Sequence, residues 1–244
     1  MSFLTGKGSK VYAGQYDLSA YFQSADTEIN CQAQDVTTFG NNWLRKIGGL
    51  KDGSASLSGL FDAAALAIDP IVHGLVGDDT GVYVTIGIGG AALADRCRLL
   101  KGKVSSYPVG TPVDGVITAN AELQPDGGVD AGDILKALAA ETAATNGTGV
   151  DNGFATTNGG VLHFHCTAAS GTNPTLDGTL EHSTDNISFA AVTGGSIVQA
   201  TAAGSQRILV VAGTSINRYT RWASTAIGGT STPTFTYAVA FARR

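Results

Sequence analysis

The 244-residue sequence has few charged side chains, with 14% Asp, Glu, Lys and Arg against roughly 25% in an average soluble domain. Glycine, threonine, serine and alanine take the place of the missing charges. When such a surface forms an interface, few charges have to leave water. The composition therefore favours a protein that packs against copies of itself.

Cysteine is scarce, and long apolar runs are missing. Cys31, Cys97 and Cys166 are far apart in the sequence and form no CxxC pair, which excludes a disulfide framework and favours a reducing compartment. Residues 1–12 lack the apolar run of a secretion signal. No stretch approaches the roughly 18 apolar residues of a membrane-spanning helix. We therefore expect a soluble, non-secreted chain without a membrane span.

The motifs of several enzyme classes are also missing. The sequence contains no G-x-S-x-G, no P-loop and no H-E-x-x-H. Asp52, Asp78, Asp79, Asp126 and Asp130 lie in or beside predicted turns, where an aspartate stabilises the turn itself. We expect no catalytic activity, no cofactor and no metal site.

The acidic residues are concentrated in the first part of the chain. Residues 1–150 hold sixteen Asp and Glu against ten Lys and Arg, whereas residues 151–244 hold four against five. This unequal distribution favours two domains. Neither part is basic enough to predict a groove that grips nucleic acid.

Apolar and polar residues alternate along several segments of the first part. In residues 53–62, Ala55, Leu57 and Phe61 alternate with serines. A period of two between turn residues predicts half-buried antiparallel strands. Similar strands are predicted at residues 27–34, 81–88, 96–107 and 116–123.

Two helices are predicted among these strands. Residues 62–77 are rich in alanine and leucine, begin at a candidate N-cap aspartate and end at a glycine. Pro70 is expected to kink or split this helix. A second, short amphipathic helix is predicted near residues 131–144.

The composition changes again after residue 148. Residues 149–160 are rich in Gly, Asn and Thr, which is typical of a linker. Residues 161–244 contain short strand-like runs separated by turn residues, for example at 170–174 and 228–233. The clearest run places Phe235, Tyr237, Val239 and Phe241 on one face. We predict domains at 1–148 and 161–244, the second an immunoglobulin-like or jelly-roll β-sandwich.

The segment His163-Phe164-His165-Cys166 contains residue types that bind metals. On a strand the two histidines share one face and Cys166 points to the other, so the three cannot surround one ion without a bulge. His182 completes a zinc site only if its strand lies beside this one in the right register. We favour polar residues on the solvent-facing side of a sandwich strand, with a small hydrolase or metalloprotein as an alternative.

An ordered series of short motifs runs through residues 17–62. Asp17-Leu18-Ser19 is followed by Thr37-Thr38-Phe39-Gly40, then Gly49-Leu50 and Asp52-Gly53, then Gly59-Leu60-Phe61-Asp62. In this order and spacing the series resembles the major tail (tail tube) proteins of long-tailed bacteriophages, of siphophage type. The resemblance covers residues 1–145. Residues from Val161 are similar to the C-terminal sandwich domains, with a decorating role, that such proteins carry.

The resemblance implies a mainly β protein with a tail-tube-like sandwich or barrel and a flanking helix. It implies a structural virion protein that self-assembles into stacked hexameric rings, a tube through which DNA passes without tight binding. Its partners are then further copies and other tail proteins, and it is made in the host cytoplasm and located in the virion tail. The expected self-assembly residues are Thr38, Phe39, Gly40, Trp43, Gly49, Leu50, Asp52 and Gly53.

An alternative function concerns the second predicted domain. Tyr219 and Trp222 lie beside two arginines, and exposed rings there would form an outer surface that stacks against a glycan. The chain would then be a baseplate, fibre or decoration protein that binds a host-cell glycan. The alternation also places Trp222 on the same face as Ile216, and we favour core packing for that face.

Overall fold

The structure, a computed structural model, describes residues 5–244 and is predominantly β, which confirms the predicted fold class. In both units described below, the long strands pair antiparallel. The elements in chain order are η1 (Gly6–Gly8), β1 (Lys10–Ala13), β2 (Tyr16–Asp17), β3 (Phe22–Asp35), β4 (Lys46–Leu60), α1 (Ile68–Leu75), β5 (Val82–Gly87), β6 (Arg96–Ser106), β7 (Val109–Gly110), β8 (Thr118–Glu141), β9 (Val150–Asp151), β10 (Gly160–Ser183), β11 (Ala190–Ser196), β12 (Gly204–Val210) and β13 (Tyr219–Arg243).

The described chain divides into two compact units. The hairpin unit comprises residues 21–81 and 100–129, and the β10–β13 unit comprises residues 5–20, 82–99 and 130–244. Strands β6 and β8 each contribute residues to both units. The division into domains at 1–148 and 161–244, which the composition predicts with a linker at 149–160, stays a prediction.

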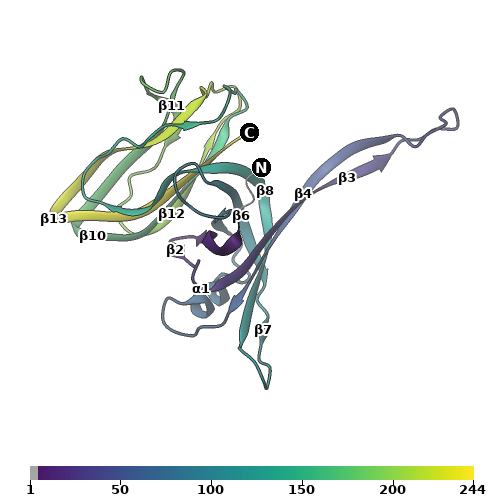
Figure 1. Ribbon diagram of the computed structural model, residues 1–244, viewed down its shortest axis with the longest axis horizontal. Helices are drawn as coiled ribbons and strands as arrows, with labels where there is room; N and C mark the ends of the chain where they lie inside the picture. Colours follow the sequence, from purple (N-terminus) through teal and green to yellow (C-terminus); the bar gives the residue numbers. More distant parts are fainter. Residues whose placement is uncertain (1–4) are drawn as a thin grey trace. The chain divides into compact units, whose positions relative to one another are not determined.

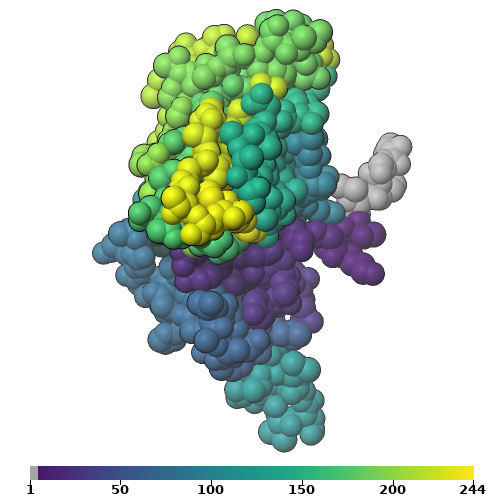
Figure 2. All heavy atoms as spheres, turned by 90° about the vertical axis from the view of Figure 1, so that its left-hand side faces the viewer, coloured from purple at the N-terminus to yellow at the C-terminus, as the bar shows by residue number. Residues whose placement is uncertain are grey.

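Two long strands organise the β10–β13 unit (Figure 1). They pair along their full length, from Gly160 opposite Arg243 to Ser183 opposite Tyr219. Strands β11 and β12 also pair with β10, while β9 and the end of β8 pair with β13. Figure 2 shows the yellow end of β13 beside teal residues of β8, although the two are far apart in the sequence.

The turns predicted at 170–174 and 228–233 are wrong. Both segments lie inside the β10–β13 pair, where the register shifts repeatedly between Ser170 and Thr175. Gly171 and Asn173 adopt positive φ angles of 107° and 49° there. Residues with a turn composition therefore form β-bulges, which interrupt the ladder without reversing the chain.

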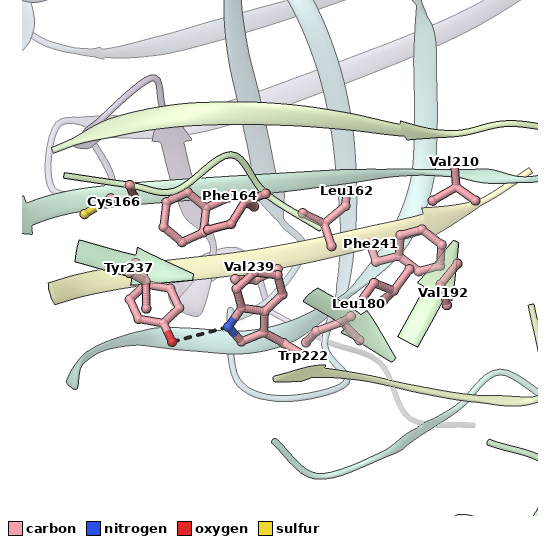
Figure 3. Packing of buried hydrophobic residues seen from close by; sticks show 14 of the residues in the cluster. Leu162, Phe164, Cys166, Leu180, Val192, Val210, Trp222, Tyr237, Val239 and Phe241 are labelled. Atoms are coloured by element: carbon pink, nitrogen blue, oxygen red, sulfur yellow. Dashed lines mark hydrogen bonds between the residues drawn. The ribbon is translucent and has the colours of Figure 1, made fainter. Parts of the chain in front are cut away.

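One face of β10 and β13 forms the main core of this unit (Figure 3). Phe164, Trp222 and Tyr237 pack ring against ring, with centroids 5.2 to 6.3 Å apart. The predicted common face of residues 235–241 is confirmed, because all four of its large side chains belong to this cluster. Burial of such aromatic rings contributes much of the stability of a β-sheet core.

The helix predicted at 131–144 is wrong. Residues up to Glu141 belong to β8, where Asp133 pairs with Phe241 and Glu141 with Phe235. Alanine-rich composition favours a helix. In this chain the hydrogen-bonding edge of β13 and burial of Ile134 and Leu135 override that preference.

Strand β4 is the centre of the hairpin unit. It pairs with β3 along most of its length and with β8 only from Ala55 to Leu60. The predicted alternation is confirmed over this paired part, where Ala55 and Leu57 are buried between half-buried serines. It fails beyond Gly53, because residues toward the tip of the β3–β4 pair are exposed on both faces.

The helix predicted at 62–77 is shorter than expected. Helix α1 spans only Ile68–Leu75, and Pro70 occupies its first turn, where a missing N–H is tolerated. Leu66 has a φ of 65°, which a right-handed helix cannot contain. The carboxylate of Asp62 accepts a hydrogen bond from the Ala64 amide at 2.9 Å, so this aspartate stabilises a turn before the helix.

Candidate functional site

All eight residues predicted to mediate self-assembly lie on one structure, which we call the assembly hairpin (residues 29–53). It is the outer part of the β3–β4 ribbon and the loop between the strands, and it extends beyond the other strands of the hairpin unit (Figure 1). Four of the predicted residues lie in the loop and the other four in β4.

Local hydrogen bonds hold the tip of the assembly hairpin in a defined shape. Asp35 accepts a hydrogen bond from the Thr37 amide at 2.8 Å, and the Arg45 amide donates to the Thr37 hydroxyl at 2.9 Å. Hydrogen bonds from Thr37 lower the pKa of the Asp35 carboxyl. A Cβ at Gly49 would lie 2.8 Å from the carbonyl oxygen of Gln32, so this glycine permits close approach of the strands.

The assembly hairpin exposes large apolar side chains to solvent. The exposed fractions of Trp43 and Leu50 are 86% and 87%. A monomeric protein exposes few contiguous apolar residues, and larger sets mark interaction surfaces. The other exposed large apolar residues of this segment are Ile29, Val36, Phe39, Leu44 and Ile47.

The backbone edges of the assembly hairpin also lack neighbours within residues 5–244. Strand β3 pairs with β4 alone, and β4 between Lys46 and Ser54 pairs with β3 alone. Such edges present rows of backbone N–H and C=O groups that another strand can pair with.

A second exposed loop, which the sequence did not single out, connects β7 to β8 in the same unit. Residues 111–117 are exposed throughout and include Val113 and Val116. The teal segment at the bottom of Figure 2 shows this loop projecting. The apolar Val113 and Val116, each directly after a turn residue (Pro112 and Gly115), are the signal from which the loop could have been found.

The net negative charge of the chain belongs to the hairpin unit. Counted over its residues, 21–81 and 100–129, there are eleven Asp and Glu and five Lys and Arg, a difference of six. The remaining residues hold nine acidic and ten basic side chains. Carboxylates at Asp26, Glu28, Asp35 and Asp52 lie on exposed positions of β3 and β4.

The histidine pair is buried, so the prediction that it faces solvent is wrong. His163 and His165 are 0% and 1% exposed. They share the face of β10 opposite Phe164 and Cys166, as the alternation predicts. They are buried because β1 and β5 cover that face. The Thr85 hydroxyl of β5 lies 3.1 Å from Nδ1 of His163 and 2.8 Å from Nε2 of His165.

The hydrogen bonds fix the protonation of both rings. Nδ1 of His165 lies 2.7 Å from the carbonyl oxygen of Gly14, which only accepts, so this nitrogen donates. Nε2 of His165 then accepts from Thr85, and Thr85 accepts from Nδ1 of His163. Nε2 of His163 is left as a buried acceptor without a hydrogen-bond partner among residues 5–244.

Both imidazoles are held neutral by their surroundings. Burial lowers the pKa of His165 to about 4, against a smaller opposing effect of the Gly14 carbonyl. Burial also lowers the pKa of His163, helped by the neighbouring His165 and Arg207 and opposed by the backbone of Val84. A buried charge without a counter-ion is unfavourable, which explains both directions.

His182 does not join the pair in a recognisable ligand group. Its Nδ1 accepts a hydrogen bond from the Asn217 amide at 3.1 Å. Within the part of the chain that the structure describes, no group of three or more His, Cys, Asp or Glu is placed to hold a metal ion. All three cysteines are free thiols, and burial raises the pKa of Cys97 to about 12 and of Cys166 to about 11.

The predicted glycan contact at Tyr219 and Trp222 does not form a joint surface. Trp222 is 2% exposed and donates its indole N–H to the Tyr237 hydroxyl at 3.2 Å, so its prediction as an outer contact is wrong (Figure 3). Tyr219 is half-buried beneath the Arg218 guanidinium, 5.0 Å from the ring centroid. The alternation that placed Trp222 with Ile216 in the core is confirmed.

No protein-family model matches the sequence, and no curated protein matches it. Among solved structures, the chain is similar to a component of the virion of a native gene transfer agent particle, with 17% identity, 52% of this chain and 97% of that chain covered, and a TM-score of 0.42. It is also similar to the SPP1 tail tube protein, with 11% identity, 51% of this chain and 77% of that chain covered, and a TM-score of 0.43. A third similar structure is the SPP1 Dit protein, described as a paradigm of the hub adsorption apparatus in phages that infect Gram-positive bacteria. Its identity is 12%, 97% of this chain and 99% of that chain are covered, and the TM-score is 0.40.

No helix among residues 5–244 is long and apolar enough to cross a membrane.

Proposed function

We propose that this chain is a structural protein of a phage tail whose copies associate through the assembly hairpin. The observation that carries the proposal is the combination of exposed apolar side chains and unpaired strand edges on residues 29–53. The motif series at residues 17–62 supports the same class of protein.

A second copy of the chain is the occupant that this surface fits best. Pairing along the free edges satisfies backbone N–H and C=O groups, and the same contact removes apolar side chains from water. The hairpin also carries both signs of charge, with Asp35 and Asp52 against Arg45, Lys46 and Lys51. An edge with both signs can face a neighbouring copy without net repulsion.

The finer proposal is that copies of the chain form rings, and that these rings stack into a tail tube. The resemblance implies six copies in each ring. In such a tube the acidic surplus of the hairpin unit, eleven carboxylates against five basic groups, lines part of the channel. Like charge repels phosphate, so DNA passes without sticking. We propose a location in the virion tail after assembly in the host cytoplasm, further tail proteins as partners, and no catalysis or cofactor.

Negative-stain electron microscopy and sedimentation of the full-length protein test the proposal. Rings or hollow tubes are expected at high concentration. Trp43→Asp and Leu50→Asp place charge on the assembly hairpin and are expected to sediment as monomers, because an unpaired charge at an interface opposes its burial. Ile187→Asp is the control, since Ile187 is equally exposed but belongs to the β10–β13 unit.

The outcomes separate the coarse from the fine proposal. Assembly that the hairpin variants abolish and the control preserves supports the hairpin contact, and the images then give the symmetry. Assembly that all three variants preserve would remove the hairpin as the contact. A parent protein that stays monomeric at every concentration, also when mixed with preformed tail fragments, would overturn the structural role.

A further inference from the structure

A hollow of about 590 Å³ lies on the β10–β13 unit, beside the start of the predicted linker at residues 149–160. Its wall contains Phe154 and Asn152 from the loop after β9, Arg96 from β6, Asp133 from β8 and Arg243 from the end of β13. Neither the proposed self-assembly nor the buried histidine pair uses this hollow. Its size suits one or two sugar-sized rings, within the usual range for small-ligand sites.

The loop that forms one wall is rigidly tied. Asp151 accepts two hydrogen bonds from the Arg218 guanidinium, at 2.7 and 2.6 Å, and one from the Gly153 amide at 2.8 Å. Gly153 has a φ of 82°, a conformation that favours glycine. The side-chain amide of Asn152 donates to two backbone carbonyls and to the Thr220 hydroxyl, at 2.9 to 3.0 Å. A loop held this firmly loses little entropy when a ligand binds.

The same loop presents an aromatic ring to solvent. Phe154 is 71% exposed. Arg243 lies over its ring at 5.1 Å from the centroid, and this guanidinium also donates to the carbonyl oxygens of Asn152, at 2.6 Å, and of Phe154. The ring is thus supported from one side and open elsewhere. An exposed ring on a fixed loop offers a flat apolar face on which a ligand can stack.

A second, shallower hollow of about 370 Å³ shares Phe154 as a wall. Its other lining residues are Ala155 and four that bear hydroxyl or amide side chains, at positions 156–158 and 215. The aromatic ring therefore stands between two polar depressions, an arrangement that matches successive units of a chain-like ligand.

The charges around the larger hollow balance. Arg96 pairs with the mostly buried Asp133 at 2.7 Å, and the second acidic and basic residues of the wall are Asp151 and Arg243. With two of each sign, a strongly charged ligand gains little net attraction. A neutral ligand with many hydroxyl groups can donate to the carboxylates and accept from the guanidinium groups at once.

We propose that the hollow around Phe154 is a binding site for a neutral pyranose sugar, most favourably an oligosaccharide that spans both depressions. The apolar face of a pyranose ring stacks on Phe154, while its hydroxyl groups hydrogen-bond to Asp133, Asn152 and Arg96. This inference goes beyond the proposed self-assembly and uses residues of the other unit.

The test measures sugar binding to the full-length protein by saturation-transfer NMR and calorimetry. The probes are methyl pyranosides of glucose, galactose, mannose and N-acetylglucosamine, the linear tetrasaccharides of the same sugars, and inorganic phosphate. We expect saturable binding of at least one tetrasaccharide and weaker binding of its monosaccharide. Phe154→Ala should weaken that binding by roughly tenfold, since this ring supplies the stacking surface.

Matched variants separate the site from general effects. Ile187→Ala removes another exposed apolar side chain of the same unit and should leave binding unchanged. Phe154→Leu keeps an apolar side chain without a ring and should bind weakly, although the loop keeps its hydrogen bonds. Phe154→Ala should also assemble as the parent does, so that loss of sugar binding and loss of self-association are distinguishable.

Two results would overturn the inference. One is the absence of saturable binding to every sugar at millimolar concentration, with or without phosphate binding. The other is sugar binding that Phe154→Ala leaves intact. If binding holds, comparing the free tetrasaccharide with an insoluble polysaccharide of the same sugar shows whether the site takes short chains or polymer segments.

Discussion

The hydroxyl of Thr85 on β5 lies 2.8 Å from Nε2 of His165 on β10, and both groups are buried. The same hydroxyl lies 3.1 Å from Nδ1 of His163. One threonine thus supplies a donor to one imidazole and an acceptor to the other. Because buried polar groups need partners, this residue determines whether two histidines can be buried on one face of β10.

Thr85→Val should destabilise the β10–β13 unit by about 1–3 kcal/mol, because it keeps the shape but leaves both imidazoles without this partner. Thr85→Ser retains the hydroxyl and should lower the free energy of unfolding by less than Thr85→Val does. Urea unfolding followed by Trp222 fluorescence, in a Trp43→Phe background, reports on this unit alone, since the chain has two tryptophans. Equal losses for the two variants would show that the hydroxyl contributes nothing.

Acid should destabilise the same unit. The pKa of His165 is about 4 in the fold and about 6.5 in an unfolded chain. The unfolded chain therefore binds a proton first as the pH falls, so the stability contributed by neutral His165 is present above pH 6.5 and is lost between about 6.5 and 4. The loss from this residue is about 3 kcal/mol.

The measurement is the urea midpoint between pH 7 and pH 4 for the parent, His165→Gln and His73→Gln. His165→Gln should flatten the pH dependence, because its side chain takes up no proton in that window. His73 is exposed on α1, so its variant should follow the parent. A profile for His165→Gln as steep as the parent's would refute the assignment to this residue.

Gly178→Ala should destabilise the main core. A Cβ at Gly178 would lie 2.6 Å from Cη2 of Trp222, a contact that the buried indole cannot relieve without moving its neighbours. Overpacking of this kind is unfavourable by about 1–3 kcal/mol. Gly204→Ala is the matched control on β12, because a Cβ there meets nothing within 4 Å. Thermal melts of the two variants should differ clearly.

Glu141 should behave as the centre of a half-buried ionic network. Its carboxylate lies 2.9 Å from Nζ of Lys136 and accepts hydrogen bonds from Thr145 at 2.7 Å and from Tyr237. Burial raises the pKa of Glu141, but the hydrogen bonds from Thr145, Tyr237 and Lys136 outweigh it, so the net direction is down.

Glu141→Leu leaves the half-buried Lys136 without its partner and should destabilise the protein by about 1–3 kcal/mol. Adding Lys136→Met to this variant should restore part of the stability, since no unpaired charge then remains. A double-mutant cycle from unfolding free energies measures the coupling. Additive losses would mean that the two side chains do not interact.

Periodicity in the sequence identified which residues share a face. It grouped Phe235, Tyr237, Val239 and Phe241, and it set Phe164 and Cys166 opposite the two histidines. This works because successive side chains of a strand alternate whatever the strand packs against. The eight predicted assembly residues came from the resemblance of the motif series, and four of them lie in β4 rather than in a connection.

Only the tertiary structure decided which faces are buried and where composition is overridden. Residues 131–141 became a strand because the edge of β13 was available to them, and β1 and β5 covered the face of β10 that carries His163 and His165. Phe154 is exposed because Asp151, Arg218 and Arg243 hold its loop outward. Each of these results depends on residues distant in sequence, whose pairing no local pattern contains.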